Sequence, residues 1–218
     1  MRAVLLSLLL ISQTAVLTAI VRRGLFRPFL FFFLYVVTLL VRQARLCVLD
    51  PKDPEYLHFW ALTLVILIPL QILAAGESAY RSLAQFQGLR IGVCAGAGAV
   101  AIIVATWIQD LQTRQTHFGV FSQADQAVAT TLFLAGLAVS LGLSWINPRR
   151  PRSAMLHERL LVFHFGVLAT SLFLLHQGYF WVSLWNLPLS AFGFLSWVWL
   201  VRNEPEAHAP RGVTIIAR

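Results

Sequence analysis

Long runs of apolar residues dominate the pattern of hydrophobic and polar positions. They occur near residues 3–21, 25–41, 57–75, 89–108, 127–147, 159–176 and 180–201. A helix needs roughly 20 apolar residues to cross a hydrocarbon core about 30 Å thick. The pattern therefore predicts an all-α fold, a polytopic transmembrane helix bundle with seven spans.

The charged residues between the runs predict how the bundle is oriented. With the amino terminus outside, twelve of the 17 Lys and Arg residues fall in inner segments and five in outer ones. The heaviest inner segment is NPRRPR at 147–152. Because short cytoplasmic loops carry the excess of basic residues, we expect the amino terminus outside and the carboxyl terminus inside.

The first run is longer than the apolar part of a signal peptide, and its heavier positive charge, Arg22 and Arg23, follows it. We expect a retained helix there. Residues 1–203 are predicted to form the bundle and 204–218 a short cytoplasmic tail, too short for an output domain.

Composition narrows the class of protein and its partners. The chain is 58% hydrophobic and 12% charged, whereas soluble domains are about 25% charged. The net charge of +8 is scattered between apolar runs, without the clustered basic face that binds nucleic acid. We expect a multi-pass protein of a bacterial cell inner membrane, whose partners are membrane lipids and other membrane protein subunits.

Local motifs predict finer features of individual helices. SQAD at 122–125 has the capping-box pattern that starts a helix. Glu77 and Arg81 have the spacing of an ion pair that extends the third helix. The four-residue spacing of small residues predicts close helix packing. It occurs at Gly92 and Gly96, and again at Gly136, Ser140 and Ser144.

Two histidines in apolar sequence, His164 and His176, are the first candidates for cofactor ligands. They lie 12 residues apart, about 18 Å along a helix axis, so they cannot share a haem. At the outer rim, His176 could meet His58 at the start of the third span. Asp50, Asp53, Glu55 and His117 lie in nearby outer loops. Since no metal motif matches, His58 and His176 are only a hypothetical haem or metal site.

The span centres contain no Asp, Glu, Lys or Arg. Intramembrane charge is typical of proton pumps, ion-coupled carriers and voltage sensors, so these classes are disfavoured. Among the neutral polar residues, His164, Gln71 and Asn186 are candidate ligand-binding residues. The alternative interpretation is that they form hydrogen bonds between helices.

Motifs of several enzyme classes are missing from the sequence. It contains no GxSxG, no HExxH and no phosphate-binding glycine loop. The last span has no lysine that could hold retinal. We therefore assign no catalytic residue and no cofactor, and the sequence does not predict an enzyme.

Three stretches carry a resemblance to known proteins. They are VRRGLFRPFLFFFLYVV (21–37), HFWALTLVILIPLQILAAGESAYRSLAQFQGLR (58–90) and FLSWVWLVRNEPE (194–206). With these stretches the chain resembles a diffuse group of bacterial seven-helix integral membrane proteins. The resemblance implies the same architecture and no particular activity.

Three hypotheses for function follow. The leading one is a non-enzymatic integral membrane protein, either an accessory subunit or a sensor-like module, that binds a lipid, an apolar ligand or a membrane protein partner. The second is a b-type haem or metal-binding redox subunit at the outer rim. The third is a facilitative transporter or channel for a neutral solute, through spans that contain Pro69 and Pro188.

Overall fold

The computed structural model describes residues 2–50, 53–83, 86–113, 118–146, 152–179 and 181–203. Within these ranges it contains seven α-helices. They are α1 (Arg2–Arg22), α2 (Leu30–Val48), α3 (Pro54–Ser82), α4 (Gln87–Thr113), α5 (Phe118–Ile146), α6 (Arg152–His176) and α7 (Val182–Asn203). The predicted all-α fold is confirmed. Most of the NPRRPR segment, His117 and the tail 204–218 lie outside the described residues.

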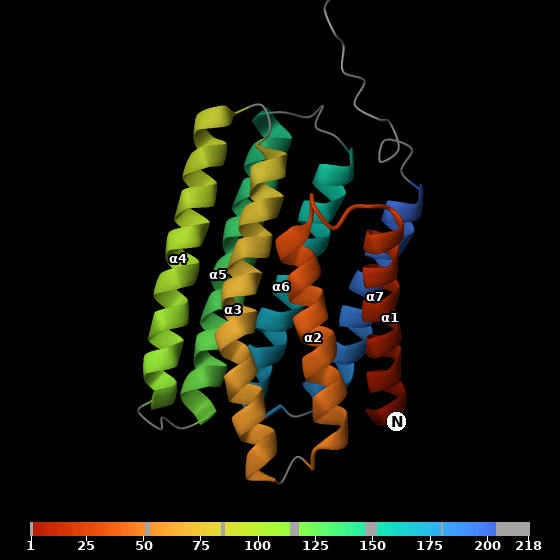
Figure 1. Cartoon of the computed structure of the whole chain (residues 1–218), viewed down its shortest axis with the longest axis vertical. Coiled ribbons are helices and arrows are strands. Elements are labelled where there is room, and N and C mark those ends of the chain that lie inside the picture. The colour runs from red at the N-terminus through yellow and green to blue at the C-terminus, as the bar shows by residue number, and fades with distance from the viewer. Residues whose placement is uncertain are drawn as a thin grey trace, which may run out of the picture.

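The helices form an up-and-down bundle (Figure 1). We call the end where α1, α3, α5 and α7 finish the upper end, and the opposite end the lower end. α3 has a central place, because it packs against α2, α4, α5 and α6. α4 lies at one edge and packs extensively only on α3. α1 and α7 pair with each other at the opposite edge.

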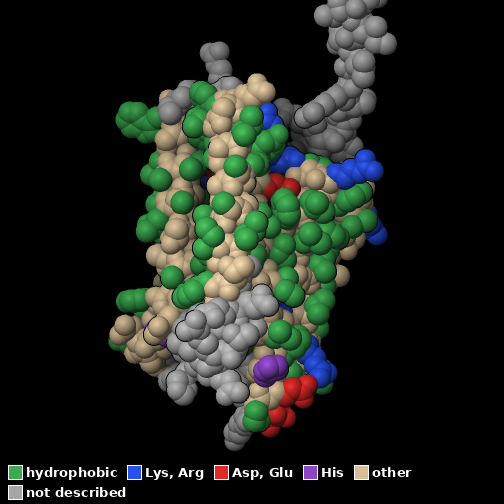
Figure 2. Space-filling view, turned by 60° about the vertical axis from the view of Figure 1, so that its left-hand side comes forward, with side chains coloured by type: hydrophobic (Ala, Val, Ile, Leu, Met, Phe, Trp, Pro, Cys, Tyr) green, Lys and Arg blue, Asp and Glu red, His purple; other side chains and the backbone are tan. Residues whose placement is uncertain are grey.

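Length and composition define the class of protein. Among the described helices, six are long and apolar enough to cross a membrane, namely α1 to α6. Hydrophobic side chains cover the middle of the face in Figure 2, and charged side chains gather toward its two ends. Such a surface is stable in contact with lipid tails. The chain is a multi-pass helical membrane protein.

The second and fifth helices differ from their predicted bounds. The run 25–41 corresponds to a helix over Leu30–Val48, and the run 127–147 to a helix over Phe118–Ile146. The chain turns before α2 at Gly24, whose φ of +64° suits glycine. The SQAD prediction was wrong, because α5 begins at Phe118 and the motif lies inside the helix. Both helices continue past the charged residues at which the apolar runs were cut.

Small residues allow neighbouring helices to approach closely. On α4 the close approach does not occur at the glycines that the sequence predicted. A β-carbon placed on Gly76 of α3 would lie 2.6 Å from the β-carbon of Ala97 on α4. A β-carbon on Gly136 would lie 2.8 Å from Val162, in agreement with the predicted packing there. A β-carbon on Gly92 or Gly96 would have nothing within 4 Å. The prediction for α4 was wrong, because these glycines face open space.

Polar contacts join the helices near the upper end. Arg81 of α3 donates from Nε to the carbonyl oxygen of Pro28 at 3.0 Å. Glu77 accepts from the backbone N–H of Phe32 at 3.2 Å. α3 therefore extends beyond its apolar run as predicted, while both side chains reach across to the chain around the start of α2.

Candidate functional site

A hydrogen bond at the centre of the bundle starts a group of buried polar side chains. The Tyr35 hydroxyl of α2 lies 2.7 Å from Nε2 of His164 on α6. Tyr35 is fully buried, and its ring packs edge-on against the imidazole at a centroid distance of 5.8 Å. Tyr35 belongs to the apolar core that side chains of α1, α2, α3, α6 and α7 form together.

The group continues into α3 and α5. The Gln71 amide donates to a carboxylate oxygen of Asp125 at 3.5 Å, and the Gln71 side chain lies near Tyr35. Arg42 lies near enough to Asp125 for electrostatic attraction, without forming a direct ion pair with it. Its guanidinium lies 4.9 Å from the ring centroid of Trp60, within cation–π range.

We call Tyr35, Arg42, Gln71, Asp125 and His164 the interior polar cluster. It connects α2, α3, α5 and α6, and Arg42, Gln71 and Asp125 are each less than a tenth exposed. In a low-dielectric interior an acidic and a basic side chain, here Asp125 and Arg42, stabilise each other, because a buried charge without a partner is costly. The cluster can therefore fix how these four helices fit together.

The expectation of an uncharged interior is corrected by this cluster. Arg42 and Asp125 were placed beyond the ends of the apolar runs, but both are buried within helices. Arg42 lies beside the ring of Trp60. The helix therefore continues through this charged residue while its side chain stays buried. Because buried charged residues are present, the sequence argument against proton pumps and ion-coupled carriers no longer applies.

The three predicted ligand-binding residues have different positions. His164 and Gln71 belong to the interior polar cluster, where Tyr35 connects them. Asn186 does not join them. It lies on α7 and accepts a hydrogen bond from Ser190 of the same helix at 3.0 Å.

At the lower end, His176 contacts α5. Its Nε2 lies 3.0 Å from the Ser122 hydroxyl, and its Nδ1 lies 2.5 Å from the Gln126 side-chain oxygen. His58 is exposed in the first turns of α3. With both ring nitrogens of His176 already engaged, this geometry favours a packing role over haem or metal ligation.

The acidic residues expected near that rim also have local partners. Asp53 caps α3 by accepting from the N–H of Glu55 at 2.9 Å. Glu55 forms an ion pair with Arg45 at 2.8 Å. Across the described part of the chain, no three His, Cys, Asp or Glu side chains are grouped so that they could hold a metal ion.

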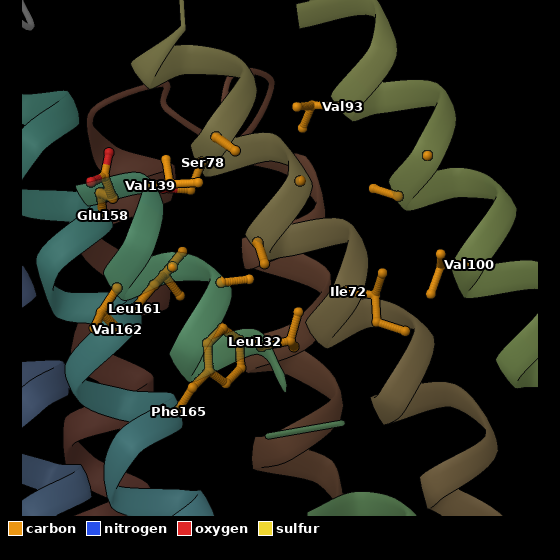
Figure 3. Close-up of a pocket in the computed structure, with 17 residues that line it drawn as sticks. Ile72, Ser78, Val93, Val100, Leu132, Val139, Glu158, Leu161, Val162 and Phe165 are labelled. Carbon is orange, nitrogen blue, oxygen red and sulfur yellow. The ribbon is translucent and has the colours of Figure 1, made fainter. Parts of the chain in front are cut away.

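A cavity of about 350 Å³ lies between α3, α4, α5 and α6 (Figure 3). Its walls are almost entirely hydrocarbon. Representative lining residues are Ile72, Val93, Val100, Leu132, Val139 and Phe165. Among the described residues α4 packs along α3 and is not a packing neighbour of α5, so these residues leave the cavity open between α4 and α5.

Two polar side chains also line the cavity, Ser78 from α3 and Glu158 from α6. Both are 4% exposed. Figure 3 shows them toward the upper end, with Phe165 and Ile72 toward the other. Ser82, one turn beyond Ser78, donates a hydrogen bond to the Glu158 carboxylate. The cavity thus combines a long apolar part with a polar end.

No protein-family model, no curated protein and no solved structure matches the chain.

Sequence reasoning missed Tyr35, Arg42, Asp125 and Glu158. A signal for Arg42 was present, since it follows Tyr35 by seven residues and so lies on the same face of α2. Glu158 lies just before the apolar run that starts at 159, so the hydrophobic pattern does not mark it as an interior residue. Its contact with Ser82 depends on how α3 and α6 pack.

Proposed function

We propose that this protein binds an apolar, lipid-like ligand within the bilayer, in the cavity between α3, α4, α5 and α6. The observation that carries the proposal is the cavity itself, about 350 Å³ in volume and lined by hydrocarbon. Ligand pockets commonly have volumes of about 300–1,000 Å³ and mostly apolar walls. We infer a non-enzymatic role, as an accessory subunit or a sensor-like module.

The residues on the walls support a ligand in preference to a simple packing gap. Gly76, Gly96, Ala97 and Gly136 all line the cavity, and Gly96 has open space where a side chain would be. A space of this size with apolar walls gives a hydrocarbon chain many van der Waals contacts, so it suits an apolar occupant. An apolar molecule can reach it from the surrounding lipid, because α4 and α5 do not pack along each other.

The neighbours of the cavity support a sensor-like role. Ile72 and Phe165 line the cavity, while the residues just before them, Gln71 and His164, belong to the interior polar cluster. A ligand that moves Ile72 or Phe165 would therefore disturb hydrogen bonds between α2, α3, α5 and α6. This gives ligand binding a physical route to a change in helix packing.

We further propose that α7 is a seventh span and that the upper end faces the cytoplasm of a bacterial cell. α7 packs against α1 and α6. The upper end carries basic residues of α1, α3 and α4, namely Arg22, Arg81 and Arg90. Such an excess of arginine is typical of the cytoplasmic side.

The test uses the full chain in lipid nanodiscs and an alkyl diazirine as a photoreactive apolar probe. We expect the probe to label peptides of α3, α5 and α6 that line the cavity. Gly96→Trp, which places a large ring in the cavity, should abolish that labelling. Gly92→Trp is the matched control, because Gly92 is one turn away on α4, has open space and does not line the cavity.

Equal labelling of the cavity peptides in both variants would contradict the proposal. Labelling spread evenly over all lipid-facing helices would contradict it too. We advance ligand binding ahead of the haem and solute-channel hypotheses because the cavity supplies the space that a ligand requires.

A further inference from the structure

The two ends of the cavity differ in chemistry, and this difference indicates the class of ligand. Hydrocarbon walls cannot distinguish one lipid chain from another, because lipid tails are as apolar as the side chains. Selectivity must come from the polar groups at the upper end. In the described part of the chain these groups are Ser78 and Glu158.

Ser78 has hydrogen-bonding capacity that the described residues do not use. Its hydroxyl oxygen is buried and has no hydrogen-bond partner among them. Other helical hydroxyl groups here bond to their own helix, as Thr14 does to the carbonyl of Leu10 at 2.8 Å. An unsatisfied buried hydroxyl is unfavourable, so a ligand group that bonds Ser78 would be stabilised.

Glu158 determines which charge the ligand group can carry. Its carboxyl group lines the same end of the cavity and accepts from Ser82. A second carboxylate or a phosphate beside it would be repelled. A cationic group is not required either, because the Glu158 carboxylate already accepts from Ser82 and a neutral donor can occupy its other oxygen. The arrangement favours a neutral group that can both donate and accept.

Resting on the proposed function, we propose that the ligand is a neutral single-chain lipid ending in a hydroxyl group. The hydroxyl donates to the Glu158 carboxylate and accepts from Ser78. The alkyl chain runs from this end toward Phe165 and Ile72, along the apolar walls. Its route of entry is from the bilayer, between α4 and α5.

The experiment is competition against the alkyl diazirine probe, with the full chain in nanodiscs. The competitors are hexadecanol, hexadecanoic acid, hexadecylamine and hexadecane, which share a chain and differ only at one end. We expect hexadecanol to compete at a concentration about tenfold lower than the other three, a preference equivalent to about 1.4 kcal/mol. An acid or an amine that matches or exceeds the alcohol overturns the inference.

Three variants assign the preference to residues. Ser78→Ala should reduce competition by hexadecanol to the level of hexadecane. Ser140→Ala, a buried serine that does not line the cavity, is the control and should leave the preference unchanged. Glu158→Gln keeps a polar group and removes the charge, so hexadecanoic acid should gain severalfold. If the acid gains nothing in Glu158→Gln, the inference is wrong.

The outcomes separate this inference from the proposed function. Probe labelling that persists in Gly96→Trp refutes both. A second outcome is that Gly96→Trp blocks labelling but all four competitors displace the probe equally. This outcome refutes the hydroxyl inference and leaves apolar ligand binding intact.

Discussion

The hydroxyl of Tyr35 on α2 and Nε2 of His164 on α6 lie 2.7 Å apart, in the middle of the bundle. α2 packs chiefly against α1 and α3, and α6 against α5, α7 and α3. The hydrogen bond therefore links two helices that are not extensive packing neighbours. It makes Tyr35 a central residue of both the apolar core and the interior polar cluster.

Replacing Tyr35 by Phe should lower the free energy of unfolding by about 1–2 kcal/mol, because it removes the hydrogen-bond partner of His164. Reversible unfolding in mixed detergent micelles measures this. Tyr179→Phe serves as the control, since Tyr179 is 49% exposed and should tolerate the change. Equal stability of the two variants would show that the interior hydrogen bond is energetically unimportant.

Arg42 and Asp125 should be energetically coupled. Either Arg42→Gln or Asp125→Asn alone leaves a buried polar group without the attraction of the other, which should cost about 1–3 kcal/mol. The double variant should lose clearly less than the sum of the single losses, with a coupling energy of about 1–3 kcal/mol. A double-mutant cycle under the same unfolding conditions gives this number. Strict additivity would mean that the two side chains do not interact.

The crossing of α3 and α4 should be sensitive to one methyl group. Gly76→Ala brings a β-carbon to 2.6 Å from the β-carbon of Ala97, which is too close for carbon atoms. The resulting overpacking should cost about 1–3 kcal/mol. Gly92→Ala has open space at that position and should be neutral or slightly stabilising. Thermal unfolding of the two variants in one detergent compares them, and equal melting would contradict the close crossing.

The natural cysteines test the proposed orientation. Cys47 is exposed in the last turn of α2 at the lower end, and Cys94 is exposed on α4 within an apolar stretch. A membrane-impermeant maleimide should label Cys47 from the periplasmic side and should not reach Cys94, which faces lipid. Cys47→Ser and Cys94→Ser identify the labelled site. Labelling of Cys47 only in inverted vesicles would reverse the orientation.

The main elements of the fold could be predicted from the sequence because each one has its own signal. A run of apolar residues long enough to cross a bilayer predicts a helix regardless of its neighbours. That reasoning located all seven helices. It misplaced both ends of α2, the start of α5 and of α6, and the end of α4 by several residues. A charged residue can end an apolar run without ending a helix. Whether Arg42 is buried depends on Trp60 of another helix.

The candidate site could be predicted only in part, for the same reason. Gln71 and His164 were identified as polar residues in apolar sequence, but Tyr35, which connects them, looks like an ordinary aromatic residue of a span. The cavity has no sequence signature. It results from α4 packing along α3 and not along α5, a relationship between three helices that no single segment encodes.

The most direct test of the central claim is an experimental density map of the full chain, purified from its native membrane and held in lipid nanodiscs. Elongated non-protein density should appear between α3, α4, α5 and α6, with one end near Ser78 and the other near Phe165, and it should be lost in Gly96→Trp. A map in which these side chains are resolved and α4 closes against α5, leaving no space for a ligand, would contradict this claim.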